Sequence, residues 1–349
     1  MISIETFLKM AVERKAQEIL LAPSQPVRLR VGKELVPMNQ SSLSITDMRQ
    51  MVSQLLNDEE RKDLFQNLKS CGSRSIGSIS FQFDFHVDLD GVTGSLVLQN
   101  PNPSQVVAQA NSNWNFPQIL TESILKPKGL HLFVGPRRSG KTTALRQVLQ
   151  SIGKKSRAIA FYSGDSTSNL QSPGNLLSQF SIEQFEKNNV PHSSDIVIFD
   201  TNNLSICEKA LGLSEEGRTV ILSLASWNIQ MGLQRFLDHC QGDQATRARR
   251  LAFTLQSVTG LNLLPGMESG LEGAFEMLLA NSEVQAALRD QNYSQISRLM
   301  KGLAEKTGMR SLNQSLFQLL IKRKIDLKTA FEFSQEPEEL DGLLKKVGI

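Results

Sequence analysis

Apolar residues in the first hundred positions follow helical spacing in some stretches and alternate in others. Residues 4–19 have helical spacing, and a second helix is expected to begin near Ser44 or Thr46, since either hydroxyl can cap it. Strand-like alternation is found over residues 27–31, 79–87 and 94–98. The last two stretches are joined around Gly91. The pattern predicts a small α+β domain over residues 1–100.

The next stretch, residues 101–118, is rich in Asn, Pro, Ser and Gln and has no hydrophobic period. Such composition is typical of a connection between two domains. We therefore expect a linker here that divides the chain roughly one to two.

Beyond the linker, short apolar stretches alternate with helical ones. The apolar stretches lie at residues 130–134, 158–162, 195–199 and 219–224. This alternation favours a parallel sheet covered by helices, which is an α/β fold. The pattern predicts such a nucleotide-binding core over residues 119–270. From about Glu272 it becomes almost wholly helical, which predicts a helical C-terminal part over residues 271–349.

The strongest chemical signal is a glycine-rich loop that fits GxxxxGK[ST] and stands between an expected strand and an expected helix. In such a loop successive backbone N–H groups point at phosphate oxygens, the lysine reaches the β and γ phosphates, and the hydroxyl binds magnesium. The alternative is a glycine turn that only joins strand to helix. The predicted ATP site consists of Gly135, Pro136, Arg137, Arg138, Ser139, Gly140, Lys141, Thr142 and Thr143.

Two arginines, Arg137 and Arg138, stand inside this loop, where smaller residues are common. They either strengthen anion binding or point to solvent, and the sequence leaves both interpretations open. A third interpretation is that Arg138 strains the backbone, because its position often prefers glycine.

A magnesium-binding acid is expected at the end of an apolar strand. Residues 196–199 form such a strand and Asp200 follows it, so Thr142 and Asp200 are the predicted magnesium ligands. Hydrolysis also needs a carboxylate that orients or deprotonates water, and cations that neutralise the γ phosphate. Asp200 and Asp165 are the candidate catalytic carboxylates, while Ala225 stands where a polar sensor is expected. Binding is therefore better supported than catalysis.

Composition narrows the class of protein further. The net charge of +3 is too small for a nucleic-acid binder, and with 6% aromatic residues a helicase groove is disfavoured. Three scattered cysteines support neither a disulfide framework nor a zinc site, which favours the cytoplasm. No stretch approaches 18 uncharged apolar residues, so no membrane span is expected.

Several segments, in order, resemble the PilT/PilU family of type IV pilus retraction ATPases, which is related to the type II secretion ATPases. They are KAQEILLAPSQPVRLRVGKEL, GLHLFVGPRRSGKTTALRQVL, SDIVIFDTNNL, EEGRTVILSLAS, LQSVTGLNLLPG, GAFEMLLANSEVQAALRD and KTGMRSLNQSLFQLLIKRKIDLKTAFEF. The resemblance implies a PAS-like N-terminal domain and a RecA-like P-loop domain with a helical C-terminal part. It also implies an ATP and Mg²⁺ site at the residues given above.

This chain departs from the family at the positions that correspond to the family's catalytic residues. The family's acidic pair is represented by Gly164 and Asp165, and its histidine by Ala225. By the same resemblance, arginines that reach a neighbour's nucleotide are replaced by Gln82, by Asp88 or Asp90, and by Leu98.

The resemblance leaves two functional hypotheses. One is an active hexameric motor that drives pilus retraction. The other, which we favour, is an ATP-binding subunit with weak or absent hydrolysis, in a homo-hexamer or in a mixed hexamer with an active relative. Either would act in the cytoplasm at the inner face of the membrane, against an inner-membrane pilus platform protein, in twitching motility.

Overall fold

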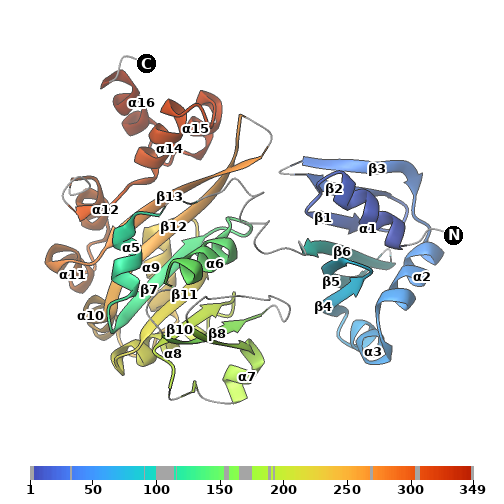
Figure 1. The fold of residues 1–349 in the computed structure, drawn as a ribbon, viewed down its shortest axis with the longest axis horizontal. Helices are drawn as coiled ribbons and strands as arrows, with labels where there is room; N and C mark the ends of the chain where they lie inside the picture. Colours follow the sequence, from blue (N-terminus) through green and yellow to red (C-terminus); the bar gives the residue numbers. More distant parts are fainter. Residues whose placement is uncertain are drawn as a thin grey trace. The chain divides into compact units, whose positions relative to one another are not determined.

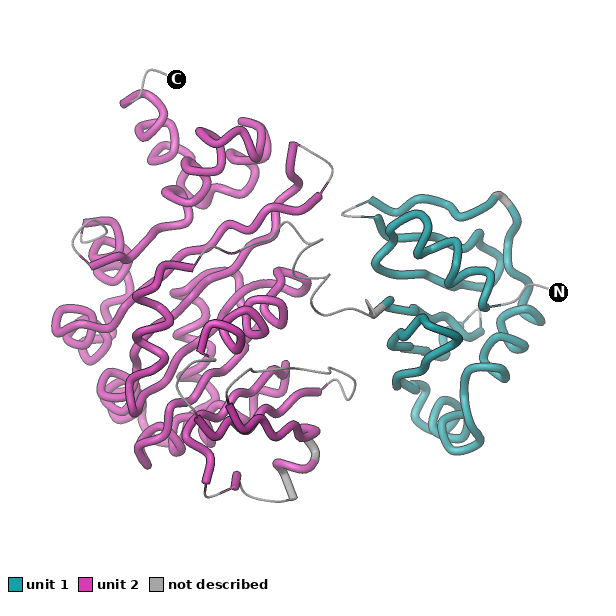
Figure 2. The backbone as a smooth tube through the Cα atoms, in the orientation of Figure 1, with its two compact units in different colours: residues 1–109 teal, residues 110–349 magenta. Residues whose placement is uncertain are grey.

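The computed structural model divides the chain into two compact units, Met1–Gln109 and Ala110–Ile349, which Figure 2 shows in different colours. It describes residues 4–31, 34–89, 91–99, 114, 116–152, 157–164, 175–187, 190–191, 193–267, 270–302 and 307–346. Most of the predicted linker, residues 101–118, lies outside these ranges, and the predicted domain boundaries stay predictions.

The N-terminal unit combines helices with an antiparallel sheet, as predicted (Figure 1). Its elements are α1 (Ile4–Glu13), β1 (Glu18–Leu21), β2 (Pro26–Val31), β3 (Glu34–Ser42), α2 (Ile45–Leu55), α3 (Asp58–Gln66), β4 (Lys69–Ile76), β5 (Ile79–Asp88) and β6 (Gly91–Gln99). The sheet order is β3-β2-β1-β6-β5-β4. The β5–β6 hairpin turns next to Gly91, as expected.

Local sequence explains several of these boundaries. Ser44 is the N-cap of α2 and forms a capping box with Asp47, which confirms one of the two predicted starts. The prediction that the first helix reaches Ile19 is wrong, because α1 ends at Glu13 and Ile19 lies in β1. Ile19 is fully buried all the same, since strand and helix contribute to one core.

The C-terminal unit alternates strands and helices and then ends in helices (Figure 1). Its first elements are α5 (Gln118–Ile124), β7 (Gly129–Gly135), α6 (Lys141–Ile152), β8 (Ala158–Ser163), β9 (Leu176–Ser181), α7 (Ile182–Lys187), β10 (Ile196–Asp200), α8 (Ile206–Glu215) and β11 (Thr219–Ala225). The others are α9 (Ile229–Asp238), α10 (Gln244–Thr254), β12 (Leu255–Pro265), β13 (Leu271–Leu279), α11 (Ser282–Arg289), α12 (Tyr293–Gly302), α14 (Leu312–Ile321), α15 (Leu327–Phe333) and α16 (Pro337–Lys346). None of the described helices is long and apolar enough to span a bilayer.

The second sheet has the order β13-β12-β7-β11-β10-β8-β9. The four predicted strands, now β7, β8, β10 and β11, pair in parallel, which confirms the α/β prediction. Parallel pairing places the carboxyl ends of these strands at one edge of the sheet, where ligands bind in open α/β folds.

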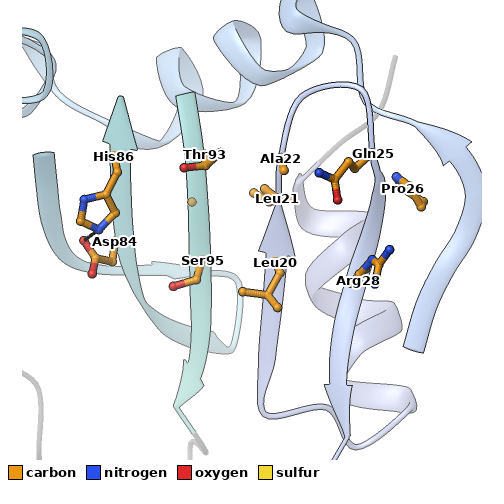
Figure 3. Close-up of a pocket in the computed structure, with 11 residues that line it drawn as sticks. Leu20, Leu21, Ala22, Gln25, Pro26, Arg28, Asp84, His86, Thr93 and Ser95 are labelled. Carbon is orange, nitrogen blue, oxygen red and sulfur yellow. Dashed lines mark ion pairs between the residues drawn. The ribbon is translucent and has the colours of Figure 1, made fainter. Parts of the chain in front are cut away.

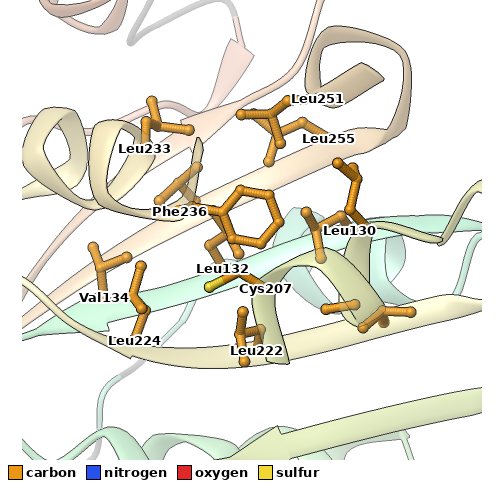
Figure 4. Close-up of a cluster of buried hydrophobic side chains, with 14 of the residues drawn as sticks. Leu130, Leu132, Val134, Cys207, Leu222, Leu224, Leu233, Phe236, Leu251 and Leu255 are labelled. Atoms are coloured by element: carbon orange, nitrogen blue, oxygen red, sulfur yellow. The ribbon is translucent and has the colours of Figure 1, made fainter. Parts of the chain in front are cut away.

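Helices cover both faces of this sheet. One face packs against α8, α9 and α10 in a cluster that includes Leu132, Cys207 and Phe236 (Figure 4). The other face packs against α5 and α6, with Phe133 and Leu145 in its core. Strands covered on both faces carry apolar residues at nearly every position, which is why these stretches could be read from the sequence.

The helical prediction from Glu272 onwards is wrong for its first residues. Leu271–Leu279 is an edge strand, β13, that pairs antiparallel with β12. Its residues are buried in succession rather than alternately, so the sequence has no period-two signal. On its other side, Met277 exchanges two backbone hydrogen bonds with Arg310.

Candidate nucleotide-binding site

The glycine-rich loop lies where the sequence places it, between the end of β7 at Gly135 and the start of α6 at Lys141. A Cβ on Gly135 would lie 2.4 Å from Ser139 Oγ and 2.6 Å from Leu261 O, so only glycine fits there. Gly140 has a φ of +83°, which also favours glycine. The loop therefore directs residues 139–143 into the N-terminus of α6, where unpaired N–H groups attract phosphate.

Lys141 turns back onto the loop that precedes it. Its Nζ donates to the carbonyl oxygens of Gly135 and Pro136, both at 2.8 Å. Burial lowers the pKa of Lys141 to about 8, an effect opposed by the charge of Asp200 and increased by Arg137. The ammonium thus stands in the loop beside Asp200, in a position to exchange carbonyl partners for phosphate oxygens.

Arg138 has a φ of +64°, which confirms the predicted strain in the loop. Arg137 and Arg138 are both exposed.

We expect Arg138→Gly to raise the free energy of unfolding by about 1 kcal/mol, because glycine adopts a left-handed backbone without a Cβ clash. Arg138→Ala is the matched control, since it removes the same guanidinium and keeps the clash. Chemical denaturation of both variants measures the difference. Equal stability of the two variants would contradict this explanation.

Three strand ends share the carboxyl edge of the sheet with the loop. Ala225 on β11 is the register partner of Gly135, and Ser226 N donates to Gly135 O at 3.2 Å. Asp200 on β10 is the register partner of Ser163 on β8. Among these described strand ends, Asp200 supplies the one carboxylate. Asp165, the other predicted catalytic acid, lies outside the described residues.

The residues after Asp200 form a local turn. Thr201 Oγ1 accepts from Asn203 N at 3.1 Å, and Asn203 Oδ1 accepts from Ser205 N at 3.0 Å, just before α8. These side chains shape the start of α8 and bring no second acid. Within the described part of the chain, no three His, Cys, Asp or Glu side chains gather to hold a metal. Thr142, at the start of α6, and Asp200, at the end of β10, stay the predicted magnesium ligands, and such an ion would take its other ligands from phosphate and water.

Trp114 belongs to this site although the sequence places it in the linker. Its indole is 1% exposed and packs against the loop, since a Cβ on Gly140 would lie 2.9 Å from Trp114 Cζ2. The ring stacks on Phe116 at 5.8 Å between centroids. An isolated tryptophan among polar residues gives no periodic signal, although its size in a polar stretch was a hint of packing.

The positions compared with the family's N-terminal arginines lie on different faces of the first sheet. Gln82 alternates with the buried Phe81 and Phe83 and so faces away from the core. Leu98 packs against that core. Asp88 is exposed at the end of β5, and Asp90 lies outside the described residues.

The face of the first sheet that carries Gln82 also has a cavity of about 300 Å³ (Figure 3). Arg28 lines it on β2, and Asp84 and His86 line it on β5. His86 Nε2 lies 3.1 Å from Asp84 Oδ1. The histidine and the aspartate are therefore paired with each other in the wall of this cavity.

Glu276 is a buried carboxyl group just behind the β11–α9 connection. Its Oε1 accepts from Ile229 N, in the first turn of α9, at 2.9 Å. Burial raises the pKa of Glu276 to about 7, against the opposing effect of that hydrogen bond. Gly260, its partner on β12, leaves it room, because a Cβ there would lie 2.5 Å from Glu276 Oε1.

We expect Glu276→Gln to be more stable than the wild type at alkaline pH. The folded pKa lies above the ordinary 4.5, so the stability that protonated Glu276 contributes is lost as pH rises through about 7. Glutamine keeps an acceptor for Ile229 N and does not ionise. Its advantage should grow to about 3 kcal/mol between pH 4.5 and 8. Denaturation at both pH values tests this, with the exposed Glu283→Gln as control; an advantage independent of pH would refute it.

Known proteins resemble the chain along nearly its whole length, although no family model matches it. It is 22% identical to the type IV pilus ATPase PilU of Pseudomonas aeruginosa, over 98% of this chain and 91% of that protein. It is 24% identical to a twitching motility protein of Neisseria gonorrhoeae, over 89% of this chain and 85% of that protein. The crystal structure of the pilus retraction motor PilT with bound ADP has the same fold, with a TM-score of 0.77, 21% identity, and coverage of 98% of this chain and 100% of that one.

The second sheet, its helices and the loop at the end of β7 define a RecA-like P-loop domain that follows a small α+β domain. Within that class the similarities support the PilT/PilU-like family of secretion ATPases. The resemblance recognised in the sequence is confirmed.

Proposed function

We propose that this protein binds ATP with magnesium through residues 135–143 and acts as a nucleotide-responsive subunit in a type IV pilus or secretion ATPase, with slow or absent hydrolysis. The observation that carries the proposal is the contrast at one sheet edge. The loop has the glycines, the lysine and the helix start that phosphate binding needs, while the described strand ends at the same edge present Ser163, Asp200 and Ala225.

Each step of binding has a residue to perform it. The N–H groups at the start of α6 and the Lys141 ammonium would bind phosphate oxygens, and Thr142 with Asp200 would hold magnesium. When bound, ATP with magnesium supplies the charge and the binding energy that hold the loop in one conformation. A water molecule at this edge would have Asp200 alone among the described strand-end carboxylates to orient it, so we expect the ATP-bound state to persist.

A second candidate function is an active motor. Similarity over the whole length to proteins named as a pilus ATPase and a pilus retraction motor favours it. In that case Asp200 or Asp165 would orient or deprotonate the attacking water.

The resemblance to this family also supports a proposal for assembly and location. We propose a homo-hexamer, or a mixed hexamer with an active relative, in the cytoplasm against an inner-membrane platform protein. The absence of the family's arginine at Gln82 supports the mixed ring, because an active relative would supply cations that this chain lacks.

One paired experiment separates the two functions. Calorimetry with ATP and magnesium measures affinity, and phosphate release is followed on the same preparation, with and without an active relative. We expect binding and a phosphate release at least ~100-fold slower than that of the relative. Rapid release by the protein alone would establish the motor instead, and no binding would refute both functions.

A further inference from the structure

We propose that Trp114 is a positioning residue for the nucleotide site: its indole fixes the phosphate loop at Gly140 and ties that loop to the segment before α5. This inference rests on the proposed ATP binding. It concerns a residue that touches the loop and would act on phosphate only through it.

The indole is held between two glycines from distant parts of the chain. A Cβ on Gly140 would lie 2.9 Å from Cζ2, and a Cβ on Gly273 would lie 2.8 Å from Cε3. Both glycines therefore allow the ring to approach the backbone directly. Gly140 immediately precedes Lys141, so the ring packs next to the residue that is expected to reach the phosphates.

Other contacts keep the ring from moving. Trp114 N donates to Gln147 Oε1 on α6 at 3.3 Å. The indole is parallel to Phe116 within 1°, and Phe116 in turn packs edge-on against Phe133 of β7 and Phe275 of β13. The phosphate loop is thus in contact with an aromatic cluster that includes a residue of its own strand, β7.

Gly140 needs such support more than another residue would. It has a positive φ and no side chain with which to hold its conformation. The indole and the side chain of Leu263 occupy the space beside it. Without the indole the loop would sample more conformations, and binding a nucleotide would have to order it again.

The polar atom of the ring indicates that the indole acts here by its size and shape and not by a hydrogen bond. Trp114 Nε1 is buried and has no hydrogen-bond acceptor among the described residues. A buried donor without an acceptor is unfavourable, and phenylalanine would avoid that cost. The benzene half of the indole, which carries Cζ2, is the part that reaches Gly140.

The first test uses the indole as its own reporter. Trp114 and Trp227 are the two tryptophans of the chain, and Trp227 is 64% exposed. In Trp227→Phe the emission comes from Trp114 alone. We expect ADP, or ATP with magnesium, to change that emission with the same midpoint as calorimetric binding. Binding without any change in emission would overturn the inference.

The second test removes the contact. Trp114→Leu should weaken nucleotide binding ~10-fold or more and Trp114→Phe less. The comparison variant Phe116→Leu shortens the stacked partner but keeps the indole against Gly140, so it should stay within ~3-fold of the wild type. If Trp114→Leu fails to fold, the comparison of Trp114→Phe with Phe116→Leu decides. Equal affinity of the Trp114 variants and the wild type would refute the role.

A third measurement is made in the absence of nucleotide. Hydrogen exchange of the amides at residues 139–143 should be ~10-fold faster in Trp114→Leu, or in Trp114→Phe to a smaller extent, than in Phe116→Leu. Faster exchange in a protein that binds no ATP would refute the proposed function and leave the positioning role standing. Unchanged exchange in a protein that binds ATP would refute the positioning role alone.

Discussion

Replacing Lys141 with alanine is expected to weaken the binding of ATP by about two orders of magnitude. The ammonium is placed in the loop, 2.8 Å from two of its carbonyl oxygens, and its charge lies beside that of Asp200. Hydrogen bonds between charged groups each contribute about 1.5–3 kcal/mol, so losing one or two of them to phosphate accounts for the size of the effect. Calorimetry on the wild type and the variant measures it.

The control for this prediction is Lys128→Ala. Lys128 is exposed and stands next to the beginning of β7, at the opposite end of the strand from the phosphate loop. The Lys128→Ala substitution removes one positive charge without touching the site, and it should leave the affinity for ATP within a factor of ~2 of the wild type. If both variants lose affinity equally, net charge and not the position of Lys141 is responsible.

The second large effect is an acid instability that originates in His131. This side chain is fully buried in β7, and its Nδ1 lies 2.8 Å from Ser257 Oγ. Burial, with a smaller effect of Lys126, lowers the pKa of His131 from 6.5 to about 3. The unfolded chain therefore takes up a proton below pH 6.5 that the folded chain does not. Stability is lost as pH falls from about 6.5 towards 3.

Glu276 acts in the opposite direction over part of this range, so the histidine is best measured in the Glu276→Gln background. There the free energy of unfolding should fall by about 2 kcal/mol from pH 7.5 to pH 5.0. Adding His131→Phe should remove most of this decrease, although the loss of the Ser257 contact lowers stability at every pH. A decrease that survives the loss of the histidine would contradict the assignment.

Much of this protein could be predicted from sequence because its signals are local. The loop from Gly135 to Lys141 carries a motif in which each residue type has a separate role, and the capping hydroxyl of Ser44 acts on the adjacent helix. Strands such as β7 and β10 are covered on both faces and so are uninterrupted apolar runs.

The remaining features depend on contacts between distant residues. β13 is a strand because β12 pairs with it, and its own residues carry no alternation. Trp114 joins the site because Gly140 and Gly273 leave space for its ring. The lowered pKa of Lys141 depends on burial, which no motif encodes. Sequence therefore located the phosphate loop but not the side chains that support it.

The pairing of Met277 with Arg310 bears on how the chain tolerates truncation. A sheet ending in β13 would present free backbone groups to other molecules, and exposed edges of this kind promote aggregation. Arg310 satisfies both backbone groups of Met277, and the hydroxyl of Ser315 on α14 donates to Phe275 O. A chain shortened before Arg310 would uncover that edge, so loss of the C-terminal helices should appear first as self-association.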